Sequence, residues 1–197
     1  MVDKDFLCDG RLLIIVRHFV LMGVMLAILS SCKSDYSKLV ERELENGRQD
    51  SLFLGLHFGM TQKEFFNRCL ELNRLHITTN GYRGNYVLYK LQDSVGIMYM
   101  HFYPEFSEDR IYEIRAIFTY QNWSIGNSKT QPDSLQRNIK RLFDRWYPAG
   151  YLITKRHEGD TVYVKVNGNR RIVIYKEGEM DVKAIFTDLL VENKIKK

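Results

Sequence analysis

The order in which the spacing of apolar residues changes along this chain limits the folds open to it. The first amphipathic helix of the globular part is signalled by "GMTQKEFFNRCLELNR", in which Thr61 and Glu64 have the spacing of a capping box and the apolar residues that follow return at helical intervals. The sequence therefore predicts a helix over 62–73. After this helix, runs with a period of two appear between residues 85 and 120, and this period is typical of strands.

A second amphipathic stretch begins at Pro132, a residue that is favoured in the first turn of a helix. Its apolar stripe contains Leu135, Ile139, Leu142, Phe143 and Trp146. Pro148 and Gly150 follow the stripe and predict the end of the helix, because neither residue continues a helix well. This helix separates two groups of predicted strands.

Runs rich in aromatic and β-branched residues predict a strand meander after each helix. The predicted strands are 85–91, 95–103 and 110–120 after the first helix, and 151–157, 161–166, 170–176 and 182–190 after the second. Residues 51–60 predict an additional edge strand before the first helix, and residues 104–109 predict a turn. The sequence therefore predicts an α+β fold of two units, each a helix followed by an antiparallel meander, with the helices packed on one face of an antiparallel sheet.

The chain before residue 51 has a different character. Residues 19–29, "FVLMGVMLAIL", form an uncharged apolar run that is shorter than the ~20 residues of a membrane-spanning helix. Such a run is typical of a signal peptide; the alternative is a short membrane anchor with an incidental cysteine. The predicted organisation is a leader over 1–31, a tether with a short polar helix over 32–50, and helix–meander units over 51–125 and 126–197.

The sequence Leu29-Ser30-Ser31-Cys32 at the end of this run resembles the lipobox of bacterial lipoproteins. The resemblance implies signal cleavage between Ser31 and Cys32 and acylation of the Cys32 thiol, which would hold the mature protein firmly on a membrane. Lys33 stands where inner-membrane lipoproteins carry a retaining aspartate. The resemblance thus implies an outer-membrane lipoprotein of a Gram-negative bacterium, facing the periplasm or the cell surface.

The stretch "LGLHFGMTQKEFFNRCLEL" (54–72) resembles the "GMT" helix start of small envelope lipoproteins with the β-lactamase-inhibitor-protein-like fold. These include the small lipoprotein subunit of the outer-membrane β-barrel assembly machine. Members of this class pair helix–meander units, have no catalytic centre, and present a surface to another protein or to the membrane. The resemblance implies the same kind of role here, without assigning it to particular residues.

Residue types that carry chemistry are scattered along the chain. Its histidines after the leader are not at metal-ligand spacing from one another; they are His57, His76, His101 and His157. No Gly-x-Ser-x-Gly elbow or phosphate-binding glycine loop occurs. Cys69 lies within an apolar helical stripe and is expected to be a buried, inert thiol. We therefore expect no enzyme, and no catalytic residue, metal or cofactor.

Basic residues on the second predicted helix are the candidate contact surface. Arg137, Lys140, Arg141 and Arg145 lie largely opposite its apolar stripe, where they are predicted to contact a partner protein or lipid headgroups. A solvated helix face is the alternative. The net charge of +5 is compatible with an anionic partner. Since an envelope protein does not meet nucleic acid, we expect no nucleic-acid partner.

The leading interpretation is a non-catalytic, lipid-anchored envelope protein that acts as a protein-binding module. One alternative is a carrier of a small apolar ligand, built as a lipocalin-like barrel; the second helix interrupts the strands that such a barrel needs. Another alternative is an envelope hydrolase, which requires histidine and carboxylate groups that converge in a cleft.

Overall fold

The computed structural model describes residues 33–81, 84–156 and 159–196. The predicted leader over 1–31 and the predicted lipid attachment site Cys32 lie outside these ranges. By compactness the chain divides into two units, residues 1–38 and 39–197. A helix, α2 (Asp35–Glu45), lies within the predicted tether, and none of its residues is buried. Within the described ranges, every helix is too short or too polar to span a membrane.

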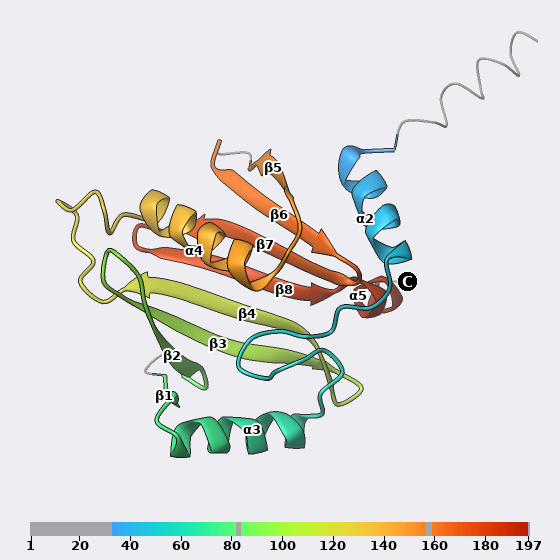
Figure 1. Ribbon diagram of the computed structural model, residues 1–197, viewed down its shortest axis with the longest axis horizontal. Coiled ribbons are helices and arrows are strands. Elements are labelled where there is room, and N and C mark those ends of the chain that lie inside the picture. The colour runs from blue at the N-terminus through green and yellow to red at the C-terminus, as the bar shows by residue number, and fades with distance from the viewer. Residues whose placement is uncertain (1–32, 82–83, 157–158, 197) are drawn as a thin grey trace, which may run out of the picture. The chain divides into compact units, whose positions relative to one another are not determined.

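An eight-stranded antiparallel sheet forms the body of the second unit (Figure 1). Its strands are β1 (Thr78–Asn80), β2 (Val87–Gln92), β3 (Ile97–Ser107), β4 (Arg110–Tyr120), β5 (Tyr151–Lys155), β6 (Thr161–Asn167), β7 (Arg170–Glu177) and β8 (Asp181–Asp188). Their spatial order is β1-β2-β3-β4-β8-β7-β6-β5, so β1 and β5 are the edges of an open sheet. The predicted α+β class is confirmed.

The strands β4 and β8 join the two meanders in the middle of the sheet. Their inward-facing residues pair as Ile114 with Phe186, Ala116 with Ala184, and Phe118 with Val182. All of these side chains are buried. Because the two alanines face each other, the centre of the pair leaves room for larger side chains from the layer above the sheet.

Helix α4 (Pro132–Trp146) supplies that layer, as its apolar stripe predicts. Leu135, Ile139 and Phe143 are fully buried, and the helix contacts β4, β7 and β8. The ring centroid of Phe143 lies 6.0 Å from that of Phe118 and 5.3 Å from that of Phe186. Since these two rings belong to β4 and β8, one side chain of α4 packs on both halves of the sheet.

Helix α3 (Gln62–Arg74) begins with the predicted capping box. The Thr61 hydroxyl accepts a hydrogen bond from the Glu64 backbone N–H, and a Glu64 carboxylate oxygen accepts one from the Thr61 N–H at 2.8 Å. The buried stripe is narrower than predicted. Phe65 is fully buried, but Phe66 and Leu70 are 44% and 57% exposed.

The position of α3 explains its narrow stripe. Strand β2 pairs with β3 only as far as Phe102, which leaves the next part of β3 without a strand on that side. The ring of Phe65 lies 5.9 Å from Tyr103 and 6.2 Å from Phe106, in this unpaired part. Helix α3 therefore lies along β1 and a strand edge (Figure 1), where one row of apolar side chains is enough to pack it.

The predicted edge strand over 51–60 is wrong. Ser51 and His57 form only an isolated bridge, and the chain between them turns back through Leu54 and Gly55, whose φ angles are 56° and 76°. Glycine adopts a positive φ without steric cost, so Gly55 permits this turn. The apolar residues of the segment are used as loop anchors instead, with the Phe53 ring buried against the core.

Three further differences concern the ends of elements. Strand β3 continues through Ser107, so the predicted turn over 104–109 shrinks to Glu108 and Asp109, both with a positive φ that suits a tight hairpin. Strand β8 ends at Asp188, whose carboxylate accepts the Leu190 N–H and begins helix α5 (Leu189–Ile195). The sequence patterns predict neither α5 nor the three-residue strand β1.

Replacing Phe143 with alanine should remove the contact that α4 makes with both halves of the sheet. Large-to-small changes of a fully buried phenylalanine cost about 3–5 kcal/mol, and we expect a loss of this size in the free energy of unfolding. Urea titration of the full chain measures it. The exposed control Arg145→Ala should stay within about 0.5 kcal/mol of the unchanged protein. Equal stability of the two variants would contradict the described packing.

Candidate functional site

Exposed basic side chains follow the outer side of α4. Residues four apart lie on the same side of a helix, so Arg137, Arg141 and Arg145 succeed one another at intervals of about 6 Å along the axis. All three side chains are exposed, whereas the opposite side of α4 is buried against the sheet. We call Arg137, Arg141 and Arg145 the arginine row.

Among the residues that the structure describes, the arginine row makes only local contacts with neutral groups. Arg137 donates a hydrogen bond to the Ser134 hydroxyl at 3.0 Å, and Arg141 donates one to the side-chain oxygen of Asn138 at 3.1 Å. Arg145 lies in the last turn, where a positive charge is favourable to the helix dipole. These contacts leave the positive charge of the row facing the solvent.

The two carboxylates of α4, Asp133 and Asp144, form ion pairs with lysines. Asp133 pairs with Lys176 at 2.9 Å. Asp144 pairs with Lys140 at 3.0 Å and with Lys165 at 3.1 Å. In the part of the chain that the structure describes, no carboxylate therefore forms an ion pair with the arginine row.

Lys140 does not join the arginine row, although the sequence groups it with those residues. Its ammonium lies 4.6 Å from the ring centroid of Tyr151 in β5, and the Tyr151 hydroxyl donates to the Lys140 backbone carbonyl at 3.4 Å. Together with its ion pair to Asp144, these contacts direct Lys140 toward β5. Lys140 thus helps to fix α4 on the sheet, and three of the four predicted contact residues remain together.

A buried lysine beneath α4 was not predicted. Lys165 in β6 is 1% exposed, and its ammonium donates to the Tyr147 carbonyl at 2.7 Å and to Asp144 at 3.1 Å. Burial lowers the pKa of Lys165, and the hydrogen bond with Asp144 opposes that effect. Carbonyls at the end of a helix lack intrahelical donors, so Lys165 caps α4. The alternation that puts Lys165 on the same side of β6 as Tyr163 is the signal that could have revealed it.

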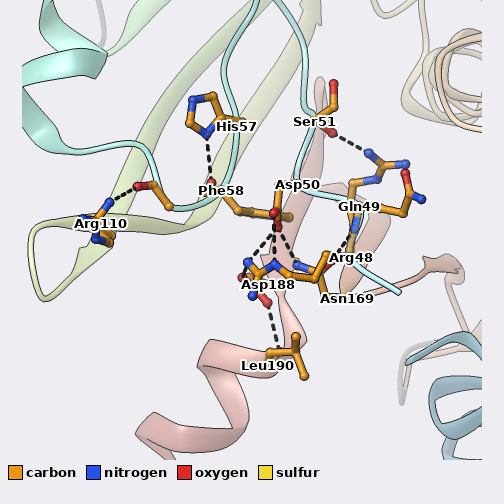
Figure 2. Close-up of polar contacts among 12 residues, drawn as sticks. Arg48, Gln49, Asp50, Ser51, His57, Phe58, Arg110, Asn169, Asp188 and Leu190 are labelled. Carbon is orange, nitrogen blue, oxygen red and sulfur yellow. Dashed lines mark hydrogen bonds and ion pairs between the residues drawn. The ribbon is translucent and has the colours of Figure 1, made fainter. Parts of the chain in front are cut away.

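Polar contacts fasten residues 48–51 to the ends of β7 and β8 (Figure 2). Arg48 donates to both carboxylate oxygens of Asp50, at 2.8 and 3.0 Å, and to Asp188 at 3.1 Å. The Asn169 amide donates to Asp50 at 3.0 Å, and its oxygen accepts the Gln49 N–H at 2.6 Å. This network determines where the chain enters the sheet domain.

The electrostatics of the network are those of a structural ion pair. Burial alone would raise the pKa of Asp50, but hydrogen bonds from Arg48 and Asn169 outweigh burial and hold the pKa below its ordinary value. The pKa of Arg48 is raised, chiefly by its hydrogen bond to Asp50. A carboxyl group that transfers protons near neutral pH needs a raised pKa. The pKa of Asp50 is lowered instead, which favours a structural role for Asp50 over an acid–base role.

A hollow of about 580 Å³ lies between α3 and β2. Phe66, Cys69 and Leu70 from α3 line it together with Val87 and Tyr103. Cys69 is half-buried rather than buried as predicted. Burial still raises the pKa of its thiol to about 11, which keeps the thiol protonated at neutral pH. The hollow lies beside the sheet. The strands form an open sheet with two edges, and not the closed barrel that a lipocalin-like carrier would have.

The described histidines occupy separate places. His57 contacts the Phe58 carbonyl at 2.9 Å, and His101 is fully buried in β3. His157 lies outside the described ranges. Across residues 33–81, 84–156 and 159–196, no group of three or more His, Cys, Asp or Glu side chains is placed to hold a metal ion.

Comparisons of the chain with protein-family models, curated proteins and solved structures found no match. The two resemblances noted in the sequence, to a lipobox and to a helix start of envelope lipoproteins, therefore remain predictions. A functional interpretation has to rest on the surfaces described above.

The lowered pKa of Asp50 predicts a defined dependence of stability on pH. A carboxylate whose pKa is lowered by folding stabilises the fold above its unfolded pKa of about 4, and this contribution is lost as the pH falls through the folded value. We expect Asp50→Asn to be less stable than the unchanged protein at pH 7 and to lose less stability on acidification. Asp144 and Glu192, whose pKa values are also lowered, should keep part of the decline.

Urea unfolding of the full chain across this pH range provides the measurement. The exposed Glu179→Gln variant serves as a control and should keep the original pH dependence. An identical decline in Asp50→Asn and in the unchanged protein would show that Asp50 is not held by Arg48 and Asn169.

Proposed function

We propose that this protein is a non-catalytic, lipid-anchored protein of a Gram-negative cell envelope, and that it binds a protein partner through the arginine row. Cys32 carries the lipid after residues 1–31 are removed, and anchors the chain at the outer membrane. The folded part consists of two helix–meander units, α3 with β1 to β4 and α4 with β5 to β8. No cofactor, metal or nucleic acid takes part in this role.

The free positive charge of the arginine row is the observation that carries the proposal. A guanidinium group binds a carboxylate through two parallel hydrogen bonds, and arginine is enriched at protein interfaces. The row lies on a helix whose opposite side is fixed in the core, so its groups are presented by a rigid element. A partner with acidic side chains at similar intervals would complete the ion pairs that the described part of the chain does not supply.

An acidic protein surface fits the arginine row better than a layer of lipid headgroups. Asp133 and Asp144 lie beside the row on α4, and their side chains are 67% and 41% exposed although they pair with lysines of the chain. A continuous anionic layer would lie against these carboxylates as well as against the arginines. A protein surface can place acidic groups opposite the row and other groups opposite the aspartates.

The alternatives find less support among the described residues. The ionisable groups that are most buried hold the fold together, as Lys165 does for α4 and Asp188 does for residues 48–51. This use gives no support to a hydrolase. A carrier of apolar ligands would have to use a hollow beside the sheet, such as the one at α3, since the sheet is open.

Reversing the charge of the row tests the proposal. In the triple variant Arg137→Glu, Arg141→Glu and Arg145→Glu, recovery of the partner by the detergent-solubilised full chain should fall at least about tenfold, because like charges then face each other. The control reverses Lys63, Arg74 and Lys129, which are exposed and lie outside the row. It changes the net charge equally and should retain the partner.

The outcome is read by quantifying co-purified proteins at low and high salt, since ion pairs at a surface weaken as salt is added. Equal recovery with both triple variants would contradict a role for the row. If reversal of the row releases the protein from anionic phospholipid vesicles and leaves protein recovery unchanged, the row contacts headgroups instead. Mass spectrometry of the same preparations should find an acylated Cys32 at the N-terminus, and no lipid on the Cys32→Ser form.

A further inference from the structure

The edge strand β5 differs from the other edge of the sheet. Edge strands expose unpaired backbone groups, and proteins protect them by keeping them short or by placing lysine or proline on them. Strand β1 has three residues, whereas β5 has five. Lys155 protects one end of β5, but Ile153 at its centre has 62% of its surface exposed. Among the described residues, no strand lies on the outer side of β5. This edge is therefore open to another strand.

The pairing of β5 with β6 fixes which backbone groups face outward. The Arg156 N–H donates to the Asp160 carbonyl at 2.9 Å, so Arg156 points toward β6. In an antiparallel pair the direction alternates from residue to residue, and the register is regular from Tyr151 to Lys155. The N–H and C=O groups of Tyr151, Ile153 and Lys155 therefore point away from the sheet.

We propose that β5 pairs antiparallel with β5 of a second copy of this chain, with the two-fold axis at Ile153. In this register Ile153 lies opposite Ile153 of the second copy, and Tyr151 lies opposite Lys155 of the second copy. Each of these pairs exchanges two backbone hydrogen bonds, which uses all of the outward-facing groups of β5. Such an arrangement is self-complementary, as a two-fold interface requires.

The side chains favour this register. The exposed isoleucines cover each other. Each Lys155 lies opposite Tyr151 of the second copy, whose ring already has the Lys140 and Lys165 ammonium groups 4.6 and 4.3 Å from its centroid, so the isoleucine contact is what favours the register. On the other side of the strand, Leu152 lies opposite Thr154 of the second copy. A shift that centres the axis on Lys155 would place two ammonium groups opposite each other, which is destabilising in a strand pair.

The dimer is expected to be weak in solution, because a pair of five-residue strands buries less surface than a standard protein interface. Anchoring both copies to one membrane would raise their effective concentration and favour pairing. This inference is independent of the arginine row, which lies on α4.

Sedimentation equilibrium of the full chain in detergent, over increasing protein concentration, should show a reversible monomer–dimer equilibrium. Ile153→Lys places two positive charges opposite each other and removes the apolar contact, so the dissociation constant of the dimer should rise at least about tenfold. Ile125→Lys is the matched control, since Ile125 is 82% exposed in the loop before α4. It should leave the equilibrium unchanged.

A second pair of variants tests the position of the two-fold axis. Ile153→Lys and Ile153→Glu should each be monomeric alone, and an equimolar mixture should form a heterodimer because opposite charges then meet at the axis. This restoration also shows that both variants are folded. A monomeric unchanged protein at all concentrations, or no restoration in the mixture, would overturn the proposal. Pairing of β5 only with a different added protein would do the same.

Discussion

The packing of Phe143 across the β4–β8 pair is the contact on which the rest of this structure depends. The two strands lie far apart in the sequence, and bringing them together costs chain entropy that local contacts cannot offset. Burial of the apolar side chains of both strands under α4 supplies the compensating free energy. Without α4, the inner face of the sheet would be exposed along its middle.

The same packing determines what α4 presents to the solvent. Its inner side is held by Phe143, and its C-terminal end is held by Lys165, which donates to the Tyr147 carbonyl and to Asp144. A helix fixed at both places has one orientation, so the arginine row has a defined direction. The open edge at β5 follows from the same architecture, since a sheet joined at β4 and β8 ends in the first strand of the second meander.

Elements governed by local periodicity could be predicted from the sequence. Strand β4 matches its predicted range, 110–120, and α4 begins at the predicted Pro132. The sequence pattern predicts a strand over 51–60 where the structure has a loop, because the apolar residues there do not reveal that Leu54 and Gly55 reverse the chain. The β4–β8 pairing also could not be predicted, since it depends on contacts between distant segments.

In the candidate site, too, the features set by local spacing could be predicted, and those set by distant contacts could not. Helical spacing predicts that the arginine row lies on the outer side of α4. It does not predict that Lys140 contacts the ring of Tyr151, because Tyr151 belongs to a strand after the helix. The network of Arg48, Asp50 and Asn169 joins segments separated by more than a hundred residues, so no local sequence pattern predicts it. Exposure of Phe66 and Leu70 likewise follows from the place of α3 beside a strand edge.

Amide hydrogen exchange of the full chain measures most directly whether β4, β8 and α4 form one cooperative unit. The buried amides of these three elements should exchange together and more slowly than those of β1 and β5, through opening of the whole sheet. If the amides of β8 exchange with those of β5 to β7 at one rate, and the amides of β4 exchange with those of β3 at another, the two meanders open separately. The β4–β8 junction would then not be the contact that holds the fold together.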